Sequence, residues 1–81
     1  MPTVFREDGF RFFFYSNEGD PREPVHVHVM KGDAVAKIWL RPFVAVAEAQ
    51  GMDDKTARRV CAIVLRNRIR IERAWNAHFS A

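Results

Sequence analysis

The chain has 81 residues, of which 48% are apolar and 28% charged, and its formal net charge is +3. This apolar content, which includes seven Phe and two Trp, excludes a disordered chain and predicts one packed domain over residues 1–81. The single cysteine, Cys61, excludes an internal disulfide, and no apolar run reaches the roughly 20 residues of a membrane-spanning helix. We therefore expect a cytoplasmic protein with no membrane partner.

The N-terminal residues predict a β-hairpin. The stretch "TVFREDGFRFFFYS" has two aromatic and β-branched segments around Asp8-Gly9, and an Asp-Gly pair is a strong signal for a tight hairpin turn. We expect strands near residues 3–6 and 10–16. The polar stretch "NEGDPREP", residues 17–24, then predicts a surface loop.

A second hairpin is expected at residues 25–30 and 34–41, across the turn Lys31-Gly32-Asp33. Pro42 should end the sheet, because proline cannot donate a hydrogen bond to a neighbouring strand. The stretch "FVAVAEAQG", residues 43–51, is interpreted as a short helix closed by Gly51.

The last predicted element is a long helix, capped by Asp53 or Asp54 and running without Gly or Pro to about His78. Its apolar residues share one stripe. Five basic residues fall together on the opposite side, namely Lys55, Arg59, Arg66, Arg70 and Arg73. Such a helix would be about 38 Å long, whereas the diameter of a compact domain of this size is roughly 30 Å. The helix should therefore overhang the domain, break or meet a partner.

These elements predict an α+β fold, in which a four-stranded antiparallel sheet of two hairpins carries a short helix and a long C-terminal helix on one face. Strand alternation sorts the residues by side. The apolar side holds Phe10, Phe12, Phe14, Val25, Val27, Val29, Ala36, Ile38 and Leu40. The opposite side mixes rings with cations, namely Arg11, Phe13, Tyr15, His26, His28, Lys37, Trp39 and Arg41.

The charge is unevenly distributed along the chain. Residues 1–51 hold six Lys and Arg against seven Asp and Glu, whereas residues 52–81 hold seven against three. The basic C-terminal part indicates an anionic partner, and Arg59, Arg66 and Arg70 are candidate phosphate contacts. The alternative is that this helix face is simply solvated.

The mixed sheet face has several interpretations. Its rings could stack on unpaired bases while Arg11, Lys37 and Arg41 hold phosphates, as on RNA-binding sheets, with Phe13, Tyr15 and Trp39 as the stacking rings. It could equally be the half-apolar outer face of a one-layer sheet, or the seam of a homodimer.

His26 and His28, two residues apart on one strand, allow two chemical interpretations. They could chelate a metal, but no cysteine pair or HExxH pattern supplies further ligands, so we expect neither a metal nor another cofactor. Alternatively, one of them is the general base of a metal-independent ribonuclease, with a nearby cation stabilising the charge on phosphorus. His78, near the end of the last helix, is the weaker candidate for that role.

The stretches "MPTVFREDGFRFFFYSNEG", "HVHV", "KGD-x-x-AKIWL-x-P" and "N-R…AW-N-x-x-F" together resemble a bacterial family, domain of unknown function 4160. The likeness covers essentially the whole chain. It implies a compact α+β domain, often encoded beside a second small protein in an arrangement similar to a type II toxin–antitoxin operon. The resemblance therefore implies a toxin-like chain with an antitoxin-like partner, and it carries over no catalytic residue.

Taken together, we expect the toxin-like component of a two-gene module, acting on RNA or nucleic-acid machinery through the aromatic and basic sheet face. One alternative is a non-enzymatic protein- or nucleic-acid-binding module that uses the same face. The other is a metal-dependent hydrolase built on the HxH strand.

Overall fold

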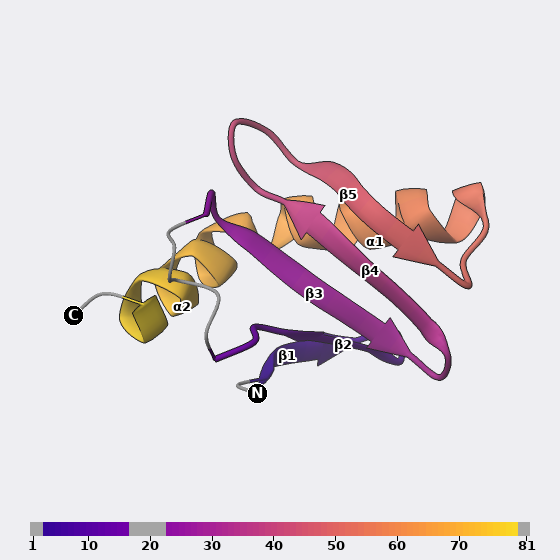
Figure 1. Ribbon diagram of the computed structural model, residues 1–81, viewed down its shortest axis with the longest axis horizontal. Helices are drawn as coiled ribbons and strands as arrows, with labels where there is room; N and C mark the ends of the chain where they lie inside the picture. Colours follow the sequence, from indigo (N-terminus) through magenta and orange to yellow (C-terminus); the bar gives the residue numbers. More distant parts are fainter. Residues whose placement is uncertain (1–2, 17–22, 80–81) are drawn as a thin grey trace.

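The computed structural model describes residues 3–16 and 23–79, which form one antiparallel sheet and two helices (Figure 1). The strands are β1 (Thr3–Glu7), β2 (Phe10–Phe13), β3 (His26–Lys31), β4 (Ala34–Trp39) and β5 (Ala45–Gln50). They lie in the order β1-β2-β3-β4-β5, so each strand pairs with its neighbour in sequence. Most of the predicted loop at residues 17–24 lies outside the described residues.

Both predicted hairpins are confirmed. Asp8 and Gly9 connect β1 to β2 with φ angles of 54° and 80°. Two successive positive φ angles give the backbone twist that matches the strands of a tight hairpin, and the Asp-Gly pair tolerates them. Gly32, with φ of 58°, lies in the turn between β3 and β4.

The sheet has five strands, and the predicted four-stranded sheet is therefore wrong. Residues 43–51, interpreted as a short helix, instead contain β5, which pairs antiparallel with β4. Pro42 and Gly51 leave only eight residues between them, which is too short for a stable helix on its own. Pairing with β4 satisfies the backbone groups along one edge of β5, and this tertiary gain outweighs the helical preference of Ala and Glu.

The long C-terminal helix is broken into α1 (Asp54–Arg66) and α2 (Arg68–Phe79). Asp53 caps α1, since its side chain accepts a hydrogen bond of 2.7 Å from the backbone N–H of Thr56. Asn67 forms the break, and its side-chain amide donates to the carbonyl of Ile63 at 2.8 Å. Breaking was one of the three outcomes that the length of the helix predicted.

One face of the sheet, here called the inner face, packs against the helices, and α1 lies behind β4 and β5 in Figure 1. The predicted apolar set is buried, with Val25 half-buried at its margin. Phe12, completely buried, stacks on Phe5 with ring centroids 4.5 Å apart. From the helices, the core receives Val60, Ile63, Val64, Ile71 and Trp75. Neither described helix is long and apolar enough to cross a membrane.

Candidate functional site

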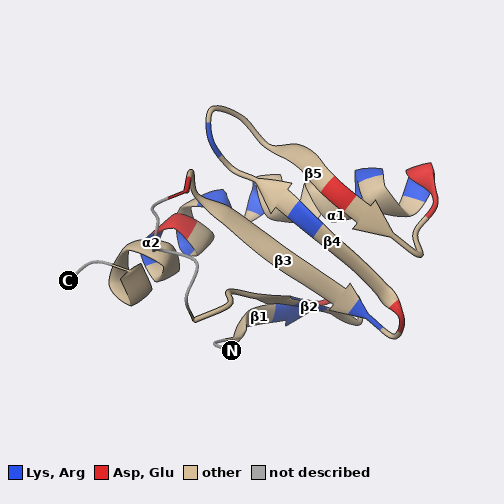
Figure 2. Cartoon of the chain, in the orientation of Figure 1, with Lys and Arg blue, Asp and Glu red and all other residues tan. Residues whose placement is uncertain are grey.

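The opposite side of the sheet, the outer face, carries a row of side chains that crosses four strands. The pairing register joins Phe13 of β2 to His28 of β3, His28 to Lys37 of β4, and Lys37 to Glu48 of β5. Paired residues on neighbouring antiparallel strands project from the same side of a sheet. We call Phe13, His28, Lys37 and Glu48 the outer row. Figure 2 shows its charged part as a basic segment of β4 beside an acidic segment of β5.

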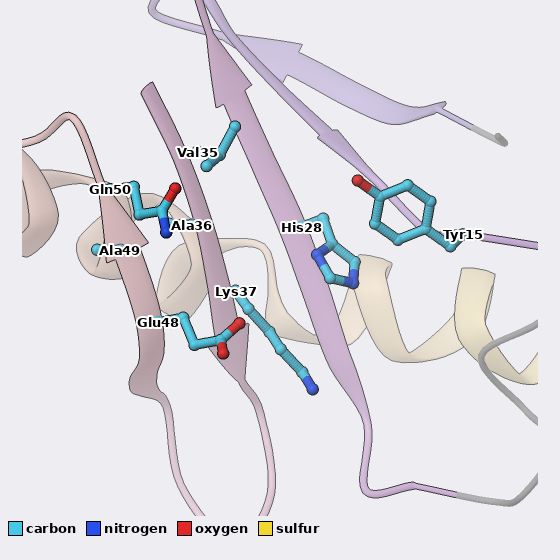
Figure 3. A pocket seen from close by; sticks show the side chains of 8 residues that line it. All are labelled: Tyr15, His28, Val35, Ala36, Lys37, Glu48, Ala49 and Gln50. Carbon is cyan, nitrogen blue, oxygen red and sulfur yellow. The ribbon is translucent and has the colours of Figure 1, made fainter. Parts of the chain in front are cut away.

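A shallow pocket of about 570 Å³ lies over this row. It is lined by Tyr15, His28, Val35, Ala36, Lys37, Glu48, Ala49 and Gln50 (Figure 3). Its walls therefore combine an imidazole, an ammonium group, a carboxylate and an amide with aliphatic side chains and one phenol ring. This is the mixture of apolar surface and few polar groups that small binding sites show.

His28 lies within this pocket, half-buried, and is held by aromatic contacts. Its ring meets the edge of Tyr15 with centroids 4.5 Å apart, and the Phe13 ring lies 5.7 Å away. Packing of this kind restricts the orientation of an imidazole while leaving part of it accessible. Of the two strand histidines, His28 is the one that a bound molecule can reach.

His26 is completely buried, so its expected place on an exposed sheet face is wrong. Its Nδ1 lies 2.9 Å from the carbonyl oxygen of Pro24, and because a carbonyl only accepts, Nδ1 carries the proton. The rings of Trp39 and Trp75 lie 5.3 and 5.0 Å away. Trp75 belongs to α2. Alternation along a strand cannot indicate that a helix packs against His26, so the burial of His26 was not predicted.

Phe13 is also buried, at 1% exposure, and it is not an open stacking platform. The guanidinium of Arg11 lies 4.7 Å from the centre of its ring, and Arg11 Nε donates a hydrogen bond to Thr3 Oγ1 at 2.8 Å. The expected exposure of Phe13 is therefore wrong. Tyr15, in contrast, is 39% exposed.

Lys37 and Trp39 form the basic and aromatic edge of the site. Lys37 Nζ lies 4.4 Å from the centre of the Trp39 ring and 3.2 Å from Glu23 Oε1. Both Lys37 and Trp39 are half-buried, so each has an accessible side. The contacts with the Trp39 ring and the Glu23 carboxylate together fix the position of the Lys37 ammonium group.

The remaining predicted cations lie outside the pocket. Arg41 pairs with Glu72 of α2, through Nε at 2.9 Å and Nη2 at 2.6 Å. Arg59 Nη2 lies 2.9 Å from Asp8 Oδ2. Arg66 pairs with Glu7, and the guanidinium of Arg70 lies 4.7 Å from the centre of the Phe5 ring.

Part of the uneven charge distribution is thus balanced within the molecule. Two basic residues of α1, Arg59 and Arg66, pair with Asp8 and Glu7 of the first hairpin. All four side chains are at least 31% exposed, and pairs this exposed contribute only about 0–1 kcal/mol each.

Glu48 is the charged pocket residue that the sequence did not identify. Interpreting residues 43–51 as a helix excluded Glu48 from the predicted sheet. The side of the pocket that this segment forms was therefore not predicted. The alternation of Val44 and Val46 with alanines, in a segment bounded by Pro42 and Gly51, is the signal that could have identified a strand.

Metal ligation has limited support in the described residues. The rings of His26 and His28 lie 5.2 Å apart, at 82° to each other. Across residues 3–16 and 23–79, no group of three or more His, Cys, Asp or Glu side chains is arranged to hold a metal ion. Elemental analysis of untreated protein remains the test of the prediction that the histidine pair binds no metal tightly.

The family model described as Domain of unknown function (DUF4160) matches residues 9–76, and the chain belongs to this family. The match includes β2 to β5, all of α1, α2 as far as Asn76, and every residue that lines the pocket. No curated protein and no solved structure shows a match to the chain.

Proposed function

We propose that this protein binds unpaired RNA on the outer face of its sheet, as the toxin-like component of a two-gene module. The observation that carries the proposal is the pocket over the outer row, where Tyr15, His28 and Lys37 meet. Base stacking on aromatic rings, together with cations that hold the backbone, is how sheet surfaces bind single strands. Trp39 and Arg11 flank this pocket along β4 and β2.

The toxin-like role and the antitoxin-like partner rest on the family resemblance alone. The test is bacterial growth after induction of the chain, alone and together with its neighbouring gene. We expect slowed growth with the chain alone and recovery with the pair. A chain that leaves growth unchanged and binds no neighbouring protein would contradict the toxin-like role.

RNA binding is tested by fluorescence anisotropy with a labelled single strand and the matching duplex. Trp39→Leu should weaken binding to the single strand about 5- to 150-fold, because one stacked base contributes about 1–3 kcal/mol. Its effect on the duplex should be smaller. An equal loss on both substrates would argue against stacking.

The phosphate contacts are tested by the salt dependence of the same affinity. Each phosphate contact contributes about 0.7 to the slope of log affinity against log salt for single strands. Lys37→Ala should lower the slope by about this amount. Arg73→Ala, which removes an equal charge from α2, should leave the slope unchanged.

A second candidate function, a non-enzymatic protein-binding module, is favoured by β5. This strand is at the edge of the described sheet, and an open edge can pair with a strand of another chain. Val46 on β5 and Phe43 just before it are 41% and 69% exposed. A complex with a protein partner but no affinity for RNA would favour this alternative.

A further inference from the structure

We propose that the pocket is a metal-independent ribonuclease centre, in which Glu48 is the general base and His28 the general acid. The inference rests on the proposed RNA binding and extends it from binding to cleavage. It assigns a catalytic role to Glu48, which the sequence had placed on a helix.

The first support is the spacing of the outer row. Neighbouring strands lie about 4.8 Å apart, so the backbones of His28 and Glu48 are about 10 Å apart, with Lys37 of β4 between them. Figure 3 shows the Glu48 carboxylate and the His28 ring on opposite sides of the Lys37 side chain. In-line attack on phosphorus needs a base on one side of the phosphate, an acid on the other and a cation near its free oxygens.

The second support is the availability of the Glu48 carboxylate. Glu48 is exposed, and within the described residues it has no cationic partner at ion-pair distance. Four other carboxylates, those of Glu7, Asp8, Glu23 and Glu72, each pair with Arg or Lys. A carboxylate held by a cation must break that pair to accept a proton, whereas Glu48 accepts one directly.

The third support is the fixed position of the proposed acid. The His28 ring is wedged against Tyr15 and Phe13, on the central strand of the sheet. Catalytic groups on strands, with side chains locked by packing, are held more accurately than groups on loops. His78, the other histidine that is not buried, lies one residue before the end of α2 and outside the pocket.

The step balances without a metal ion or an added reagent. Glu48 removes the proton of a ribose 2′-hydroxyl, and the 2′-oxygen forms a bond to phosphorus. The bond from phosphorus to the 5′-oxygen breaks, and protonated His28 gives its proton to that oxygen. The products are a 2′,3′-cyclic phosphate and a 5′-hydroxyl end, and Lys37 neutralises the charge that builds up on the phosphate oxygens.

This chemistry defines the substrate as unpaired RNA. The 2′-hydroxyl is the nucleophile, so DNA is not a substrate, and a flexible single strand can adopt the in-line geometry. The shallow pocket also suits a strand whose bases can be splayed apart and stacked on Tyr15.

The experiment follows cleavage of an end-labelled single-stranded RNA at neutral pH with a chelator present. Removing a general base or acid costs about 10²- to 10⁴-fold in rate, so Glu48→Gln and His28→Gln should each lose activity to that extent. Glu48→Gln should retain RNA affinity by anisotropy, which separates loss of chemistry from loss of binding. Asp33→Asn, an equal charge change in the exposed β3–β4 turn, is the matched control and should cleave normally.

A second substrate tests whether the ribose 2′-hydroxyl is the nucleophile. The same RNA with 2′-O-methyl groups should bind but not be cut, and fragments of the normal RNA should end in a 2′,3′-cyclic phosphate. Undiminished cleavage by Glu48→Gln, cleavage of the methylated strand, or loss of cleavage with chelator would each overturn the proposal. RNA that binds but is never cut would overturn it too, while leaving the proposed binding function standing. Failure to bind RNA at all would contradict the binding function itself.

Discussion

At the scale of single residues, the side of the sheet that each residue faces was predictable from the sequence. The extent to which each side chain is buried was not. Alternation identified the inner face correctly, down to Phe12 and Ile38. It also placed Phe13 and His26 on the outer face, where both are buried. Arg11, two residues earlier on β2, covers part of the Phe13 ring, and Trp75 of α2 packs against His26. A period of two carries no information about contact with a helix.

Phe12 tests the inner face. Its ring is completely buried and stacked on Phe5, so Phe12→Ala should lower the free energy of unfolding by about 3–5 kcal/mol. That loss is close to the whole stability of a domain this small. Urea unfolding measures it, and Leu65→Ala, at an apolar residue that is 51% exposed, is the control. A Phe12→Ala protein as stable as the control would show that Phe12 does not lie on the packed inner face.

Cys61 allows a prediction from its pKa. Burial raises the pKa of the Cys61 thiol above its usual 9.0. The folded protein therefore holds the thiol proton more tightly than the unfolded chain, and this contribution to stability is present below pH 9 and lost as the pH rises through the raised pKa. Thiol labelling at pH 8 should accordingly be slower in the native protein than in denaturant. Equal rates in the two states would contradict this prediction.

At the scale of elements, the prediction from sequence was wrong where contacts between strands outweighed the helical preference of the residues. Both hairpins carry their turn signals in sequence, at Asp8-Gly9 and Gly32, and both formed where expected. The segment of β5 contains three Ala and one Glu, which favour a helix, and only pairing with β4 makes it a strand. With β5 misread as a helix, Glu48 and the pocket could not be predicted, whereas His28 and Lys37 could.

The start of α1 tests helix capping. Hydrogen bonds from Thr56 lower the pKa of Asp53 below its usual 3.8. A lowered pKa means that the stabilisation is present above 3.8 and is lost as the pH falls through the lowered value. Asp53→Ala should therefore melt at a lower temperature than the parent at pH 6, and the gap should narrow towards pH 3. A gap that is constant between pH 6 and pH 3 would show that the charge of Asp53 contributes nothing.

At the scale of the whole molecule, the described fold is a one-layer sheet with helices on one side and an open pocket on the outer face, where Trp75 of α2 packs against His26 at one end. The sequence predicted this layering and the mixed chemistry of the outer face. It also interpreted the basic C-terminal part as a candidate phosphate surface. The structure shows that part of this charge is paired with the first hairpin, as Arg59 with Asp8 and Arg66 with Glu7. The outer face, rather than the Arg side of the helices, is therefore the surface on which we place RNA.

This placement is tested most directly by backbone amide chemical shifts of isotope-labelled protein, recorded by NMR during titration with a short single-stranded RNA. We predict that the largest changes occur at Tyr15, which follows β2, and at His28, Lys37 and Glu48 on β3, β4 and β5. The amides around Arg59, Arg66 and Arg70 should move little. Changes confined to those three arginines, with the outer row unaffected, would contradict the account.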